Sequence, residues 1–115
     1  MKKFEANWTP FTPVAPERVT HGNPTTRLAE TVAGESFKSG LWEVTPGRFT
    51  TAPRGFDEVI HIIKGSGVLR SADGTAVKLA PGVSFLMEDG FVGEWEIHEQ
   101  LQKFYAKAQT VTTGS

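Results

Sequence analysis

The sequence contains no cysteine and only three histidines. Without cysteine the chain has no disulfides, no thiolate zinc sites and no cysteine nucleophile. Neither sign of charge is in excess, because 12 Lys and Arg residues stand against 13 Asp and Glu residues, for a net charge of -1. A chain without surplus basic residues has little to neutralise phosphates, so nucleic acids and anionic membranes are not expected as partners.

Long apolar runs are also missing, and no segment approaches the roughly 20 residues that span a bilayer. Residues 1–8 have the basic opening of a signal peptide, but no apolar stretch follows it. We therefore expect a cytoplasmic protein without a membrane partner. A length of 115 residues suits one domain with one core.

Proline is concentrated near the N-terminus, since four of the seven prolines fall within residues 1–28. Proline cannot donate to a strand ladder, so this part is predicted to be an extended arm with edge pairing at most. Phe4, Trp8 and Phe11 give the arm apolar groups to lay on a surface. We place the arm at residues 1–35, covering either its own domain or a partner subunit, with a turn or so of helix near 25–33.

From residue 36 onward, glycine-containing and proline-containing turns recur at intervals of roughly 7 to 10 residues, as in a sandwich or barrel. Asp73-Gly74 is a strong hairpin signal. An all-β domain is therefore predicted over 36–109, and a flexible tail over 110–115. The predicted strands lie near 41–45, 48–51, 57–64, 67–72, 75–79, 84–88, 92–99 and 101–108.

Alternation assigns faces to the strand that begins at Asp57. Glu58 and two isoleucines share one face, and Val59, His61 and Ile63 share the other. Both faces are largely apolar, so the strand is expected to be covered on both sides. An exposed apolar stripe is normally buried by a partner, and we predict that the outward face of this strand lies at the contact of a homodimer.

The spacing of the turn glycines resembles that of cupins. In that family the first motif is written G(X)5HXH(X)3–4E(X)6G and the second G(X)5PXG(X)2H(X)3N. Here six residues separate Glu58 from Gly65, and Gly82, Gly90 and Gly93 follow the spacing of the second motif. The series is close to compact one-domain cupins related to ureidoglycine aminohydrolase and to ethanolamine-utilisation cupins. This resemblance implies a small double-stranded, jelly-roll-like β-barrel over residues 40–107.

The metal ligands that the resemblance implies are missing. The positions of the two histidines before Glu58 hold Thr51 and Pro53, or Ala52 and Arg54 with the shorter spacing, and Gly93 takes the place of the third. One carboxylate cannot hold a transition metal tightly in a site built for four ligands. We expect no metal site and no cofactor. The three histidines, His21, His61 and His98, read as solvated or partner-facing.

The remaining candidates for a site are organic side chains. By parity and by resemblance Glu58 faces the barrel interior, where Trp42, Trp95, Lys103 and Tyr105 are expected to line the same space. A carboxylate in an apolar pocket without a cation has a raised pKa and can act as a general acid or base. Alternatively, Glu58 pairs with Lys103 or Arg54, and the two tryptophans are core residues first.

Three functions remain open. The first is binding of a small polar or carboxylate-bearing metabolite, of unknown identity, in the barrel without a tightly bound metal. The second is a metal-independent lyase, isomerase or hydrolase with Glu58 as the catalytic acid/base. The third is an interaction module whose barrel is plugged by its own side chains.

Overall fold

The computed structural model describes residues 1–109, and nearly all of its regular structure is β-strand. The fold is all-β, as the turn spacing predicts, and the expected tail at 110–115 lies outside the described residues. The elements are β1 (Thr12–Pro13), a 3-10 turn (Pro16–Arg18), β2 (Val19–His21), β3 (Thr25–Ala33), β4 (Phe37–Val44), β5 (Gly47–Thr50), β6 (Phe56–Ser71), β7 (Ala76–Leu79), β8 (Ser84–Met87) and β9 (Gly93–Gln109).

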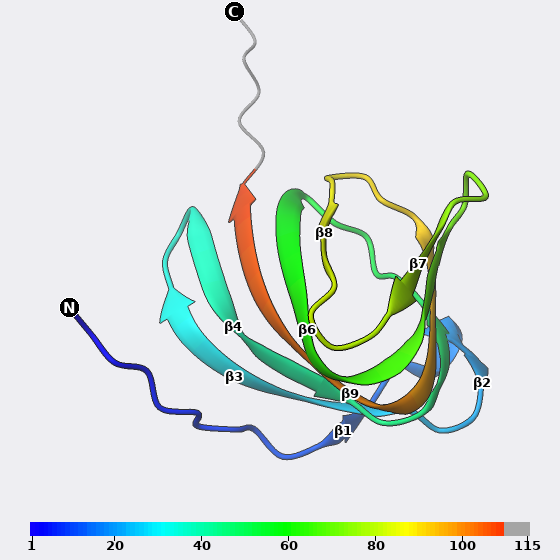
Figure 1. Ribbon diagram of the computed structural model, residues 1–115, viewed down its shortest axis with the longest axis horizontal. Coiled ribbons are helices and arrows are strands. Elements are labelled where there is room, and N and C mark those ends of the chain that lie inside the picture. The colour runs from blue at the N-terminus through cyan, green and yellow to red at the C-terminus, as the bar shows by residue number, and fades with distance from the viewer. Residues whose placement is uncertain (110–115) are drawn as a thin grey trace, which may run out of the picture.

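Two long strands, β6 and β9, form the spine of the fold and pair antiparallel with each other. Each also pairs with two shorter strands along its other edge. The second edge of β9 carries β4 and β5, and the second edge of β6 carries β8 and β7. Because both long strands bend between their two short partners, the sheet curls over itself into an open barrel (Figure 1).

The bend in β6 falls at Gly65-Ser66-Gly67, where the pairing with β9 shifts register. Gly65 has a φ of +96°, and a Cβ there would lie 2.4 Å from the carbonyl oxygen of Gln100. Only glycine tolerates that conformation and that approach. The sequence predicted strand ends on either side of these glycines, whereas the structure has one continuous bent strand with bulges.

The helix expected near 25–33 is wrong, because these residues form β3, which pairs along β4. The segment is rich in β-branched residues, which favour strands over helices. Its side chains also alternate: Leu28 lines the barrel interior, whereas Arg27 pairs with Glu43 on the outer surface. The amino-acid sequence of this segment shows no clear helical or alternating pattern of apolar residues. Its pairing with β4 therefore decides its conformation.

The Asp73-Gly74 hairpin is confirmed between β6 and β7. Gly74 has a φ of +94°, and the Asp73 carboxylate accepts hydrogen bonds from the backbone and hydroxyl of Thr75 at 2.9 and 2.7 Å. Hydrogen bonds of this type hold the turn locally. The hairpin positions β7 along the second half of β6.

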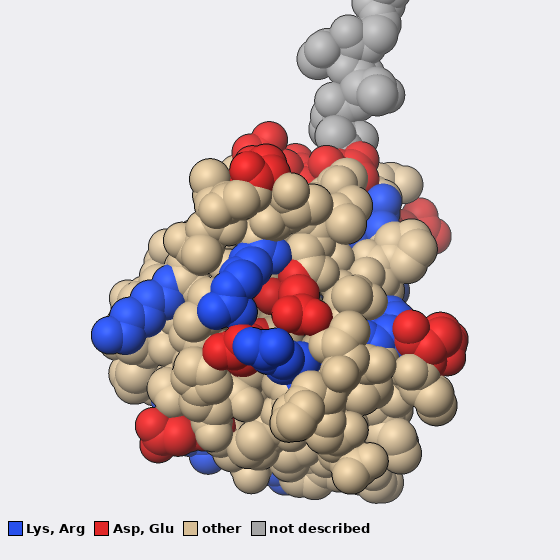
Figure 2. Space-filling view, turned by 90° about the vertical axis from the view of Figure 1, so that its right-hand side faces the viewer, with Lys and Arg blue, Asp and Glu red and all other residues tan. Residues whose placement is uncertain are grey.

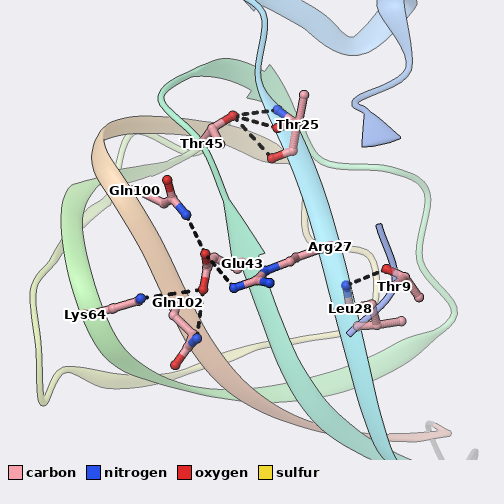
Figure 3. Close-up of polar contacts among 9 residues, drawn as sticks. All are labelled: Thr9, Thr25, Arg27, Leu28, Glu43, Thr45, Lys64, Gln100 and Gln102. Carbon is pink, nitrogen blue, oxygen red and sulfur yellow. Dashed lines mark hydrogen bonds and ion pairs between the residues drawn. The ribbon is translucent and has the colours of Figure 1, made fainter. Parts of the chain in front are cut away.

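The N-terminal segment runs along the free edge of β3, where β1 pairs antiparallel with β3 (Figure 1). Thr9 exchanges hydrogen bonds with the backbone of Leu28, at 2.8 and 3.0 Å. The Arg27 guanidinium stacks on the ring of Trp8 at 4.1 Å and also contacts Glu43, which is almost fully buried. Glu43 accepts further bonds from Gln100 and Gln102 and pairs with Lys64 (Figure 3). This cluster ties the segment and four strands, β3, β4, β6 and β9, together.

The predicted faces of β6 are confirmed. Ile60 and Ile62 are fully buried in the core, while Val59 is 55% exposed and Ile63 41% exposed. The expectation that this strand is covered on both sides is therefore not met within the single chain. Among residues 1–109 no helix is long and apolar enough to cross a membrane.

Acidic and basic side chains are mixed on the surface. Glu96, for example, pairs with Arg48, Arg70 and His98. Blue and red groups also lie next to each other on the face shown in Figure 2. This mixing matches the near-zero net charge and leaves no large field of one sign on that face.

Candidate ligand-binding site

The curled sheet holds a cavity of about 210 Å³ that is open to solvent on one side. All five side chains that the sequence assigned to a ligand site line this cavity. They are joined by residues of β3, of β5 and of the loop between β5 and β6. The aromatic and charged residues that line the cavity are Arg18, Trp42, Arg54, Phe56, Glu58, Trp95, Lys103, Tyr105 and Lys107.

Strand alternation places this set. On β9, Lys103, Tyr105 and Lys107 are two residues apart, so they project from the same face. Glu58 of β6 is paired in register with Lys107 of β9. Trp42 of β4 is paired in register with Lys103 of β9. Side chains from three neighbouring strands, β4, β9 and β6, therefore project into the same cavity.

Glu58 is the centre of a buried ion cluster. Its Oε2 accepts a hydrogen bond from Lys103 Nζ at 2.8 Å, and its Oε1 accepts one from Arg54 Nη1 at 3.1 Å. Arg54 also donates to the carbonyl oxygen of Met87 at 3.2 Å. Both Glu58 and Lys103 are only 6% exposed. The pairing that the sequence left open is therefore present with both cations at once.

The local charge sets the pKa values of this cluster. Burial alone raises the pKa of Glu58, but the charges and hydrogen bonds of Lys103 and Arg54 outweigh it, so the pKa lies below its ordinary value. Burial lowers the pKa of Lys103, and the Glu58 carboxylate does not fully offset this effect. Both shifts have the direction expected where positive charge is in excess. The sequence predicts a raised pKa for Glu58 only if no cation lies beside it. Because Lys103 and Arg54 both lie beside Glu58, its pKa is lowered instead.

We predict that Glu58 titrates below the ordinary value of about 4.3. A lowered folded-state pKa stabilises the fold above the unfolded-state value, and this contribution is lost as the pH falls through the folded value. Carboxyl NMR titration should show the low midpoint in the native protein and a higher one in Lys103→Met. A midpoint at or above the ordinary value would contradict the ion cluster.

Aromatic rings form the walls around the amine of Lys103. The Trp42 and Trp95 rings lie 5.6 Å apart, and Lys103 Nζ lies 4.5 Å from the first ring centre and 4.9 Å from the second. Phe56 lies against both Arg54, at 4.6 Å, and Lys107, at 4.7 Å. Cation–π contacts of this kind hold basic groups in place without neutralising them.

Two buried donors in the cavity wall have no hydrogen-bond partner among the described residues: the Tyr105 hydroxyl and Arg54 Nε. Burial, together with Glu30 and Glu58, raises the pKa of Tyr105 to about 12, so the hydroxyl stays protonated. Gly40 makes room for it, because a Cβ there would lie 2.8 Å from the hydroxyl oxygen. Buried donors normally have an acceptor, but both of these atoms are closed off from solvent and so from the open part of the cavity.

Sequence reasoning overlooked Lys107 and Arg18 as members of the site, and considered Arg54 only as a partner of Glu58. Lys107 falls in the same alternation as Lys103 and Tyr105, so the strand pattern could have found it. Arg54 and Arg18 come from segments without a period, and nothing in the sequence pattern places them at the cavity.

The donor set does not fit a metal ion. Glu58 is the one acidic residue in the cavity lining, and both of its oxygens are held by cations. The three histidines do not line the cavity, and His61 instead contacts Ser84 on the outer surface at 2.6 Å. Within residues 1–109, no three His, Cys, Asp or Glu side chains gather as metal ligands do.

We predict that the purified protein carries no stoichiometric Mn, Fe, Ni, Cu or Zn. One carboxylate, already paired with two cations, cannot replace the three or four ligands that such ions need. Elemental analysis of protein without an affinity tag measures this. Near one equivalent of metal that disappears in Glu58→Ala would overturn the assignment of the site.

The curled antiparallel sheet, with a cavity on its inner face, defines a cupin-type barrel. Residues 31–105 match the family model of the EutQ-like cupin domain. The chain therefore belongs to the EutQ-like cupin family, as the resemblance of its turn glycines implied. No match is found among the curated proteins.

Solved structures share the fold. A protein of unknown function from Pseudomonas syringae pv. tomato is 25% identical with a TM-score of 0.74, over 90% of this chain and 45% of that one. The chain thus spans less than half of that protein. A putative ethanolamine utilization protein from Salmonella typhimurium is 15% identical with a TM-score of 0.64, over 94% and 100% of the two chains. Ectoine synthase from P. lautus is 13% identical with a TM-score of 0.67, over 76% and 66%.

Proposed function

We infer that the protein binds a small carboxylate-bearing metabolite in the barrel cavity without a tightly bound metal. The observation that carries this proposal is the charge of the cavity lining. Four basic side chains, Arg18, Arg54, Lys103 and Lys107, line the cavity with a single carboxylate, that of Glu58. Glu58 can neutralise only part of that charge, and an anionic ligand would neutralise more.

Lys107 is the best placed basic group to receive the anion. Among the described residues it has no carboxylate within ion-pair distance, whereas Lys103 and Arg54 both contact Glu58. A carboxylate oxygen accepts several hydrogen bonds, and such charge-assisted bonds are stronger than neutral ones.

The size of the cavity favours a small ligand. Its volume of about 210 Å³ lies below the roughly 300–1,000 Å³ of pockets for drug-sized molecules. The presence of a cavity also supports a binding barrel over a plugged interaction module. A larger hollow of about 500 Å³ near β7 and β8 has acidic residues and no Lys or Arg in its lining, so it does not suit an anion.

Acid–base catalysis by Glu58 has less support. Its lowered pKa keeps it ionised at neutral pH, so it cannot serve as a proton donor. As a base it would have to give up hydrogen bonds to Lys103 and Arg54, which hold both oxygens. Glu58 is better suited to hold these two cations in position beside the ligand.

Calorimetry with lactate, malate and succinate, and with their neutral amides, tests the proposal. We expect an acid to bind and its amide not to bind. Lys107→Gln should weaken binding about tenfold, since a hydrogen bond to a charged group contributes about 1.5–3 kcal/mol and ~1.4 kcal/mol corresponds to a tenfold change. Lys78→Gln, an exposed lysine on β7 outside the cavity, is the matched control and should bind normally. Equal affinity for acid and amide would contradict the proposal.

A further inference from the structure

We propose that Lys103 is a reactive amine that forms an imine with a 2-oxo acid bound in the cavity. The inference rests on the proposed function, because it uses the same basic groups to hold the carboxylate of the ligand. It adds a chemical class, a 2-oxo acid, and a covalent step.

The surroundings of Lys103 favour a neutral amine more than those of the other lysines. An ammonium group has three N–H donors, yet within residues 1–109 the only hydrogen-bond acceptor of Nζ is Glu58 Oε2. The faces of Trp42 and Trp95 occupy much of the space around it. Glu58 is also shared with Arg54, so one negative charge serves two buried cations.

Both burial and the nearby cations lower the pKa of Lys103. A buried amine beside other cationic groups is a known way to obtain a nucleophilic lysine. The matched comparison is Lys78, on the short strand β7, which is exposed. The two side chains have the same chemistry and differ in environment, so reactivity can be compared within one molecule.

The cavity also provides the other groups that imine formation needs. Lys107 and Arg18, which line the same cavity, are available to bind the carboxylate of a 2-oxo acid. Tyr105 lies on the same face of β9 as Lys103 and lines the cavity beside it. These contacts would place the carbonyl carbon beside the amine.

The chemistry balances without an oxidant or reductant. Lys103 first loses a proton to solvent water, which leaves a lone pair on Nζ, while Glu58 stays ionised and holds Arg54. This lone pair attacks the carbonyl carbon. The oxygen then takes one proton from Nζ and one from solvent, and it leaves as water when the carbon–oxygen bond breaks. One ammonium group and one carbonyl group thus give one protonated imine and one water molecule.

Reductive trapping tests the proposal on the native protein. The protein is incubated with pyruvate or oxaloacetate and sodium cyanoborohydride, and the adduct is located by mass spectrometry of peptides. We expect about one adduct per chain, on Lys103, and little on exposed Lys78. Lys103→Arg, which keeps the charge, should remove the adduct, and Lys78→Arg should retain it. Absence of an adduct, or labelling of lysines in proportion to their exposure, would overturn the proposal.

Lactate and malate separate this proposal from the binding function, because they carry the carboxylate but no carbonyl group to condense. If they bind to the native protein and pyruvate or oxaloacetate gives no adduct, imine formation is wrong and carboxylate binding stands. If neither the hydroxy acids nor the oxo acids bind, the binding function itself is wrong. Because the adduct is mapped in the native chain, the result does not depend on the folding of any variant.

Discussion

Replacing Lys103 by methionine is expected to lower the free energy of unfolding by about 3 kcal/mol, because the variant removes one partner of a buried ion pair. Glu58 would keep Arg54 as a partner, so the loss should lie near the lower end for such pairs. Urea unfolding monitored by tryptophan fluorescence measures it. Lys103→Met combined with Glu58→Gln should not recover the loss, because the buried Arg54 guanidinium would then lack its carboxylate partner.

The surface pair of Arg70 and Glu96 is the matched control. Both pairs have an N–O distance of 2.8 Å, but the cation of the surface pair is 48% exposed and that of the buried pair 8%. Exposed pairs contribute about 0–1 kcal/mol, so Arg70→Met should have a small effect. Equal losses for Lys103→Met and Arg70→Met would show that the Glu58 cluster does not stabilise the fold.

Replacing Ile63 by aspartate is expected to convert a homodimer into a monomer, as measured by light scattering at micromolar concentration. We propose that the outer face of β6 and its neighbours pairs with a second copy of the chain. Val59 and Ile63 are joined on this face by Leu86 on β8 and Phe104 on β9, which are also exposed. Strand pairing places Val59 opposite Leu86 and His61 opposite Phe104. An apolar patch of this kind is normally covered.

The chemistry of this face suits a second copy. In a two-fold contact the same surface meets itself, so a permanent charge near the axis would lie close to its own copy. Val59, Ile63, Leu86 and Phe104 carry none. The N-terminal segment contacts β3 through Thr9 and Trp8 and leaves these side chains exposed. Val92→Asp, at an exposed apolar residue in the loop between β8 and β9, is the control and should stay dimeric. A native monomer, or a dimeric Ile63→Asp, would contradict the interface.

Local chemistry explains which parts of the fold could be predicted. The Asp73-Gly74 hairpin and the alternation around Glu58 depend on neighbouring residues, so the sequence pattern is sufficient for both. The conformation of residues 25–33 depends on their pairing with β4. A local sequence pattern does not contain that contact. The bend at Gly65 was visible as a turn signal, but whether it ends a strand or bends one depends on β9.

The site shows the same division. Parity placed Glu58 in the interior, and resemblance to cupins identified the positions where metal ligands are missing. Arg54 occupies one of these positions, and its guanidinium now contacts Glu58. The sequence pattern could not show this, because the loop before β6 has no period. Glu43 was overlooked for a related reason: alternation places it on the outer surface, and the side chains that surround it there come from β3, β6 and β9.

An NMR titration of the tryptophan indole N–H groups tests the proposed binding site most directly. The chain has three tryptophans, of which Trp42 and Trp95 line the cavity, while Trp8 stacks on Arg27 outside the sheet. Adding lactate, malate or succinate should shift the Trp42 and Trp95 signals along a saturable curve and leave Trp8 in place, and the neutral amides should shift none of them. If no acid moves Trp42 or Trp95, or if all three signals move together, the cavity is not a carboxylate-binding site.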